Sequence, residues 1–185
     1  VHAGDGSLIA EYAQERRLFV PIDVVPEHVI NAFLAAEDKN FFNHIGIDFV
    51  GIARAVLQNV LNLASGKRLE GASTITQQVA KNFLLSSDVT LERKLKEAVL
   101  ALRLERTFNK RQLLELYLNE IYLGLGSYGV AAAALNYFDK PLGELTLEEA
   151  AYLAALPKAP NNYHPFRQRA RALARRNWVL GRMAS

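Results

Sequence analysis

The sequence predicts a mainly α-helical domain, and three observations support that fold class. Apolar residues recur at spacings of three and four through most of the chain, which is the period of an amphipathic helix. Residues that cap helices, such as Thr90, Asn109 and Thr146, stand just before several of these stretches. Loose alternation of apolar and polar residues, which indicates extended chain, is confined to residues 7–24.

The predicted elements follow one another with short connections. Residues 7–24 form a short hairpin or an extended arm. Pro26 lies in the first turn of the first helix, Asp48 caps the second helix, and Gly66 ends it. The segment 124–126 breaks the chain before the sixth helix, and three later prolines indicate a loop before the last one. The expected helices are 26–39, 49–65, 73–85, 90–108, 109–122, 128–138, 146–156 and a final arginine-rich helix.

Length and composition fit one folded domain. The chain has 185 residues, of which 50% are hydrophobic and 22% charged, with a net charge of +3 and no cysteine. A chain of this size buries about 70% of its unfolded surface, so disorder and a disulfide-built miniprotein are excluded. The lack of cysteine excludes thiol catalysis and cysteine-bound zinc. No apolar run approaches the roughly 18 residues of a membrane-spanning helix.

The helix expected at 49–65 is unusual because its polar residues form a single row. Arg54, Gln58 and Asn62 are four residues apart, and almost every other position is apolar. Apolar side chains therefore cover more than one core-facing stripe. Two explanations stay open: the helix is buried in the core, or one face meets lipid or a long apolar ligand.

Residues 37–48 form the first candidate site. Glu37 stands at the C-terminal end of a helix, where the helix dipole disfavours negative charge. Phe41 is close by, so we expect a raised pKa for Glu37, which is typical of a general base. A structural or capping role is the alternative. Asp38 and His44 complete the cluster, but its spacing matches no compact metal-binding motif.

Residues 71–82 form the second candidate site. A glycine followed by Ser73 and Thr74 at a helix N-terminus offers N–H groups and hydroxyls to an anion. Polar and cationic side chains follow along the helix: Gln77, Gln78, Lys81 and Asn82. The P-loop motif is missing, and an ordinary helix cap with polar residues facing water is the alternative.

Residues 93–97 form the third candidate site. The expected core stripe of this helix is made by Leu91, Leu95, Ala98, Val99 and Leu102. At about 100° per residue, Arg93, Lys94 and Glu97 lie off that stripe and near one another. An exposed Arg93–Glu97 ion pair is the simpler interpretation. Together with Lys81, however, Arg93 and Lys94 can neutralise a diphosphate, and Glu97 can orient these bases or a sugar.

Five sequence blocks stand in a characteristic order. They are Glu-Asp-x-x-Phe-x-x-His-x-Gly at 37–46, Gly-x-Ser-Thr-x-Thr-Gln-Gln at 71–78, Arg-Lys-x-x-Glu at 93–97, Gln-Leu-Leu-Glu-Leu-Tyr-Leu-Asn at 112–119 and Leu-Pro-Lys-Ala-Pro at 156–160. Together they resemble the family 51 glycosyltransferases, the transglycosylase domains of class A penicillin-binding proteins and of monofunctional transglycosylases. The resemblance covers about residues 4–183.

The resemblance implies a helical fold related to lysozyme, with a smaller membrane-associated jaw at about residues 48–72 inside a glycosyltransferase domain at 1–183. Such enzymes polymerise lipid II into β-1,4 glycan and release undecaprenyl diphosphate. The implied partners are lipid II, the growing glycan strand, the outer surface of the bacterial membrane and moenomycin-type inhibitors, with no nucleic acid. The implied location is the periplasmic face of the inner membrane, through an N-terminal anchor outside this chain.

The resemblance also assigns the catalytic residues. Glu37 matches the catalytic base, and Glu97 matches a second essential glutamate. Lys81 matches the pyrophosphate-binding lysine, with Arg93 and Lys94 nearby. A sugar hydroxyl needs a base to take its proton, whereas a diphosphate leaving group needs positive charge. The implied reaction is inverting, with no covalent intermediate and no required cofactor, and a role for Mg²⁺ or Mn²⁺ stays open.

Six further residues match supporting positions of the family. Those expected to line the donor pocket are Thr74, Gln78 and Asn82. Those expected to shape the surroundings of the base are Asp38, Phe41 and His44. Monofunctional relatives often carry a further arginine before the third block, which residues 86–90 lack.

Several interpretations of the whole chain compete. No Ser-x-x-Lys motif occurs, so we expect the transpeptidase, like the anchor, to lie outside this chain. The run 175–180 resembles the segment that leads into a transpeptidase, which favours an excised domain of a class A penicillin-binding protein over a monofunctional enzyme. A lysozyme-like hydrolase that uses Glu37 as an acid is another alternative. Residues 164–185 contain six arginines and no acidic residue, so a basic module for DNA or anionic lipid is a third.

Overall fold

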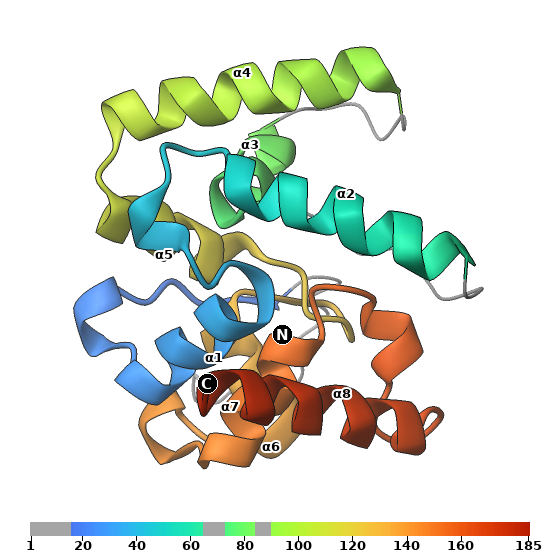
Figure 1. Cartoon of the computed structure of the whole chain (residues 1–185). Helices are drawn as coiled ribbons and strands as arrows, with labels where there is room; N and C mark the ends of the chain where they lie inside the picture. The colour runs from blue at the N-terminus through green and yellow to red at the C-terminus, as the bar shows by residue number, and fades with distance from the viewer. Residues whose placement is uncertain (1–15, 65–72, 84–89) are drawn as a thin grey trace.

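The computed structural model describes residues 16–64, 73–83 and 90–185 (Figure 1). Within them the chain is mainly helical, as predicted. The α-helices are α1 Glu27–Glu37, α2 Phe49–Ala64, α3 Ile75–Phe83, α4 Leu91–Thr107, α5 Lys110–Glu120, α6 Val130–Phe138, α7 Leu147–Ala155 and α8 Arg169–Met183. The short elements are β1 Arg16–Arg17, β2 Ser127–Tyr128 and the 3₁₀ helices η1 Ile22–Val24, η2 Phe41–Asn43, η3 Leu142–Glu144 and η4 Pro160–Tyr163.

Local hydrogen bonds begin the helices where the sequence predicts. The side chains of Thr90, Asn109 and Thr146 each accept the backbone N–H three residues on, and the last two belong to full capping boxes. Asp48 accepts the N–H of Gly51 at 2.8 Å and so caps α2. Pro26 is the N-cap of α1 and not part of its first turn. Gly66, the expected end of the second helix, lies outside the described residues.

The helices form a lower body and an upper layer in Figure 1. In the body, α7 packs against both α1 and α8, which also contact each other. In the upper layer, α3 packs against both α4 and α5. One continuous core joins the two, with Phe33, Tyr117 and Leu153 fully buried in it. The Phe33 and Tyr117 rings meet edge to face, with centroids 6.2 Å apart. This shared core fixes the end of α1, and thus Glu37, relative to α3.

The N-terminal segment does not form the hairpin that was one expectation for residues 7–24. Among the described residues, β1 is extended and pairs in parallel with β2, Arg16 opposite Ser127 and Arg17 opposite Tyr128. The Arg17 guanidinium lies 4.3 Å from the centre of the Tyr128 ring and bonds Glu120 at 2.6 Å. The extended arm is therefore correct for residues 16 and 17, and residues 7–15 lie outside the described part.

The orientation of α4 is opposite to the prediction. Leu91 is 91% exposed, and Leu95 and Val99 are exposed as well, whereas Glu97 is only 3% exposed. The helix packs on α3 through Glu97, Ala101 and Leu104 instead. Periodicity locates an apolar stripe, but only the neighbouring helix decides which face it covers.

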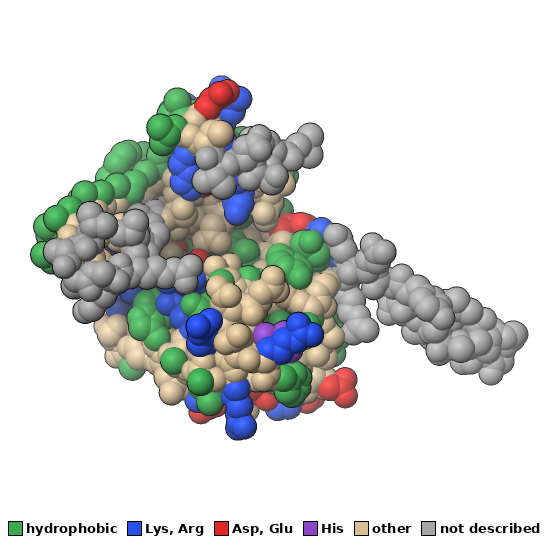
Figure 2. All heavy atoms as spheres, turned by 90° about the vertical axis from the view of Figure 1, so that its right-hand side faces the viewer, with side chains coloured by type: hydrophobic (Ala, Val, Ile, Leu, Met, Phe, Trp, Pro, Cys, Tyr) green, Lys and Arg blue, Asp and Glu red, His purple; other side chains and the backbone are tan. Residues whose placement is uncertain are grey.

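Most of the large apolar side chains of α2 face solvent and not the core. Phe49, Val50, Val56, Leu57, Val60 and Leu61 are all exposed, and polar Asn62 is buried. The core explanation for this helix is therefore wrong. Apolar side chains gather along one edge of the upper layer in Figure 2. No helix in the described ranges is long and apolar enough to cross a bilayer.

Candidate active site

A cleft of about 760 Å³ separates α4 from α8, and α1, α3 and the segment after α7 also line it. Figure 2 shows this face hollowed between the two layers, with Lys and Arg side chains above and below. Two carboxylates line the cleft, those of Glu37 and Glu97. Six cationic side chains surround them: Lys81, Arg93, Lys94, Lys158, Arg175 and Arg182. The cleft is therefore suited to an anionic molecule.

Glu37 is the last residue of α1 and turns its carboxylate into the cleft. Its Oε2 accepts a hydrogen bond of 2.9 Å from the side-chain amide of Gln78 in α3. Burial raises the pKa of Glu37, and the neighbouring Asp38 adds to the rise, while Gln78, Arg175 and Lys158 oppose it. The direction agrees with the expectation, with burial as the main cause. A carboxylate with a raised pKa in a cleft is suited to proton transfer.

Asp38 ties the loop after α1 to the start of α3. Its buried Oδ2 accepts the N–H of Ile75 at 3.0 Å and Nε2–H of His44 at 2.9 Å. The N–H of Gly46 points at His44 Nδ1 from 3.1 Å, which assigns the ring proton to Nε2. The Thr74 hydroxyl donates to the Gly46 carbonyl at 2.6 Å. These bonds hold the loop against α3.

Phe41 belongs to this loop and packs into the core. Its ring is fully buried, meets the His44 ring edge to face at 6.1 Å, and has Lys110 Nζ 4.4 Å from its centre. Asp38, Phe41 and His44 therefore contact one another or the backbone, and none of the three is among the residues that line the cleft.

The upper wall of the cleft is cationic and pre-ordered. Lys94 Nζ donates to Glu97 Oε1 at 2.6 Å and to the Ser73 hydroxyl at 3.1 Å. The ion pair of Glu97 is thus made with Lys94, where the sequence favoured Arg93. Glu97 is almost fully buried, whereas the Lys94 side chain is 55% exposed, so this ion pair anchors an ammonium that still lines the cleft. Lys81 of α3 and Arg93 line the same wall.

Of the predicted catalytic and substrate-binding residues, the cleft brings together six: Glu37, Gln78, Lys81, Arg93, Lys94 and Glu97. Thr74 is buried beneath it, and Asn82 is exposed near the end of α3 and does not line it. The described residues contain no group of three or more His, Asp and Glu side chains that could hold a metal ion.

Sequence reasoning missed the lower wall of the cleft. Lys158, Arg175, Trp178 and Arg182 all line it. Lys158 lies inside the Leu-Pro-Lys-Ala-Pro block, and the other three are spaced by three and four residues. That spacing places them on one face of α8, so the helical period was the available signal.

The chain belongs to the transglycosylase family, since the family model described as "Transglycosylase" matches residues 5–184. Its class of enzyme is peptidoglycan glycosyltransferase. Within the family it is similar to penicillin-binding protein 1A, at 56% identity to the proteins of Rickettsia felis and Aquifex aeolicus and 51% to that of Escherichia coli. Each match covers 99% of this chain but only 21–25% of the relative.

A solved structure supports the same fold. The 2.6 Å crystal structure of penicillin-binding protein 1A from Haemophilus influenzae matches with a TM-score of 0.54 and 32% identity. The match covers 98% of this chain and 17% of the crystallised chain. The chain therefore spans about a quarter or less of the length of these relatives.

Proposed function

We propose that the chain polymerises lipid II into β-1,4 glycan by an inverting displacement, with Glu37 as the general base. The observation that carries the proposal is one cleft holding Glu37 together with Lys81, Arg93 and Lys94. The acceptor hydroxyl loses its proton to Glu37 as its oxygen attacks the anomeric carbon of the donor. The bond to the diphosphate breaks on the opposite side, and the undecaprenyl diphosphate leaves as an anion.

The cationic wall is matched to that leaving group. Lys81, Arg93 and Lys94 stabilise the charge that develops on the diphosphate, so no acid is needed to protonate it. Glu97 accepts from Lys94 and holds its ammonium in place before substrate arrives. Attack opposite the leaving group converts an α-linked diphosphate into a β-linkage, and a covalent glycosyl-enzyme has no part in it. These side chains are the source of positive charge that we propose for the diphosphate.

A lysozyme-like hydrolase is the competing function. A carboxyl group with a raised pKa is also suited to protonate a glycosidic oxygen, so Glu37 alone does not distinguish the two. The charge around Glu37 does distinguish the two functions. Six cationic side chains line the cleft, and finished glycan carries no diphosphate for them to bind. This surplus of positive charge favours a lipid diphosphate as the substrate.

The exposed face of α2 supports a membrane-facing jaw at about residues 48–72, beside a lysozyme-like body within a domain at 1–183. Six large apolar side chains on one helix are exposed, and lipid II presents a long polyprenyl chain at the membrane surface. We place the domain on the outer surface of the bacterial inner membrane, anchored by a segment outside this chain. Moenomycin-type phosphoglycolipids would then compete with lipid II for the cleft.

The test is incubation of the chain with labelled lipid II, with and without moenomycin. We expect polymer whose synthesis falls about 10²- to 10⁴-fold in Glu37→Gln, with the fold retained. Lys81→Ala should weaken donor binding more than folding. Matched controls are Glu120→Gln and Lys96→Ala, which change exposed residues engaged in surface ion pairs. Shortening of finished glycan, or full activity in Glu37→Gln, would overturn the proposal.

A further inference from the structure

Two hydrogen bonds join the end of α1 to the start of α3. Gln78 of α3 donates from Nε2 to Glu37 Oε2 at 2.9 Å, and both side chains line the cleft. The next residue, Asp38, accepts the backbone N–H of Ile75 at 3.0 Å. The first bond reaches a side chain of α3 and the second its backbone. The general base is therefore held directly by an amide on the neighbouring helix.

The helix that carries Gln78 is itself firmly held. Thr74 and Gln77 form a capping box, in which the side chain of each accepts the backbone N–H of the other, at 2.9 and 3.1 Å. The Thr76 hydroxyl donates to Glu105 of α4 at 2.6 Å. These bonds fix the first turn of α3 in place, whereas the bond of Gln78 is directed to the general base.

The chemistry of the two groups decides how the amide is turned. An ionised carboxylate only accepts hydrogen bonds, so Gln78 must present an N–H to Glu37. The bond stabilises the charged form and so lowers the pKa of Glu37, against the larger rise that burial causes. It also restricts the carboxylate plane, because the last torsion of a glutamate side chain is otherwise broad.

We propose that Gln78 is a positioning residue of the transferase reaction, whose side-chain amide orients the Glu37 carboxylate toward the hydroxyl of the acceptor sugar. This inference rests on the proposed function. The hydroxyl gives its proton to Glu37 as its oxygen bonds the anomeric carbon, and Gln78 exchanges no proton. A carboxylate free to rotate would spend less time in the geometry that the transfer needs. The role differs from donor binding, which the sequence suggested for this residue.

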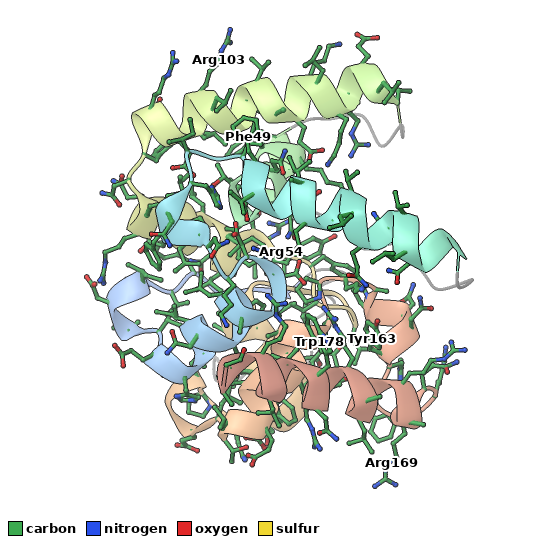
Figure 3. The ribbon with its side chains drawn as sticks, in the orientation of Figure 1. Phe49, Arg54, Arg103, Tyr163, Arg169 and Trp178 are labelled. Atoms are coloured by element: carbon green, nitrogen blue, oxygen red, sulfur yellow. The ribbon has the colours of Figure 1, made fainter. Side chains whose placement is uncertain are left out.

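The charged groups around Glu37 stay in place when Gln78 is replaced by a neutral residue. On the lower wall, the guanidinium groups of Arg175 and Arg182 lie 3.7 and 5.0 Å from the centre of the Trp178 ring, which Figure 3 shows between α8 and α2. The charged and titratable groups that line the cleft or act on the base are Asp38, Lys81, Arg93, Lys94, Glu97, Tyr117, Lys158, Arg175 and Arg182. A neutral substitution therefore tests the amide alone.

The experiment compares Gln78→Met and Gln78→Glu with Gln168→Met. Methionine has the length of glutamine without an N–H, and glutamate has its shape but a carboxylate that cannot donate. Gln168 is the matched control, because it is the N-cap of α8, makes no side-chain capping bond and does not line the cleft. We expect kcat for lipid II polymerisation to fall about 10- to 100-fold in both Gln78 variants, with KM within about two-fold of wild type. Gln168→Met should match wild type.

Two outcomes of these kinetics would overturn the inference. A raised KM with an unchanged kcat would show that Gln78 binds substrate. Full activity in Gln78→Glu would show that the shape of the side chain matters and its N–H does not. Circular dichroism checks the fold of each variant, and Gln78→Glu serves if Gln78→Met does not fold.

A double-mutant cycle shows whether the effect of Gln78 runs through Glu37. In the Glu37→Gln background no base is left to orient, so adding Gln78→Met should change the residual rate by less than about two-fold. A further loss as large as that in the wild-type background would mean that Gln78 acts on the substrate directly, and the inference would fail.

A measurement without substrate separates this inference from the proposed function. The pKa of Glu37, read by NMR from ¹³C-labelled glutamate, should rise in Gln78→Met, because the carboxylate loses a donor, and should stay at the wild-type value in Gln168→Met. An unchanged Glu37 pKa in Gln78→Met would count against the inference, whereas a wild-type chain that makes no polymer would count against the proposed function.

Discussion

Replacing Asp38 tests the coupling between the loop after α1 and α3. Both of its hydrogen bonds, from the Ile75 N–H and from His44, end on the same buried oxygen. Bonds to a carboxylate are worth about 1.5–3 kcal/mol each, so Asp38→Ala should lower the free energy of unfolding by about 3–6 kcal/mol. In Asp38→Asn the amide oxygen can take the place of Oδ2 and accept both bonds, so only the charge is lost. We expect about 1–2 kcal/mol for that variant.

The assay is urea unfolding followed by circular dichroism, with a thermal scan beside it. For a domain of this length, Asp38→Ala should lower Tm by about 10 °C and Asp38→Asn by a few degrees. Polymerisation should fall in the same order, because Gln78 and Lys81 stand on the helix whose first turn is released. Equal losses for the two variants would refute the reasoning, since they would show that the two bonds to Oδ2 carry none of the effect.

Three further predictions concern other parts of the molecule. Since the pKa of Glu37 is raised above 4.5 in the folded state, wild-type stability falls as pH rises from that value through the folded pKa. Glu37→Gln lacks this titrating group, so its free energy of unfolding should rise relative to that of wild type across that window. If urea unfolding from pH 4 to 8 gave free energies that change in parallel for the two proteins, this expectation would be contradicted. The fully buried hydroxyl of Tyr117 has no hydrogen-bond partner among the described residues. Tyr117→Phe should therefore raise the free energy of unfolding by about 1 kcal/mol. A decrease of the same size in urea unfolding would show that the hydroxyl makes a hydrogen bond. Leu57→Asp should lower binding to anionic vesicles about ten-fold in a sedimentation assay, with Leu147→Asp on α7 as the control; equal effects would argue against a membrane-facing α2.

Much of the helical framework follows from the sequence because helix ends are decided locally. Thr90, Asn109 and Thr146 each meet a partner three residues away, so their caps need no other part of the chain. The same holds for the position of Glu37 at the end of a helix. The motif blocks identified Glu37 and the cationic residues of the upper wall of the cleft, because the residues of each block are contiguous in the sequence.

What only the tertiary structure decided is which faces of the helices meet. Leu91 and Leu95 form as regular a stripe as any core helix, yet α4 turns Glu97 inward because α3 and the cleft lie on that side. The pairing of β1 with β2 and the lower wall of the cleft, with Arg175, also depend on contacts between distant segments. A repeating pattern specifies a stripe on each helix, but the burial of that stripe depends on the neighbour that covers it, and a single sequence does not name the neighbour.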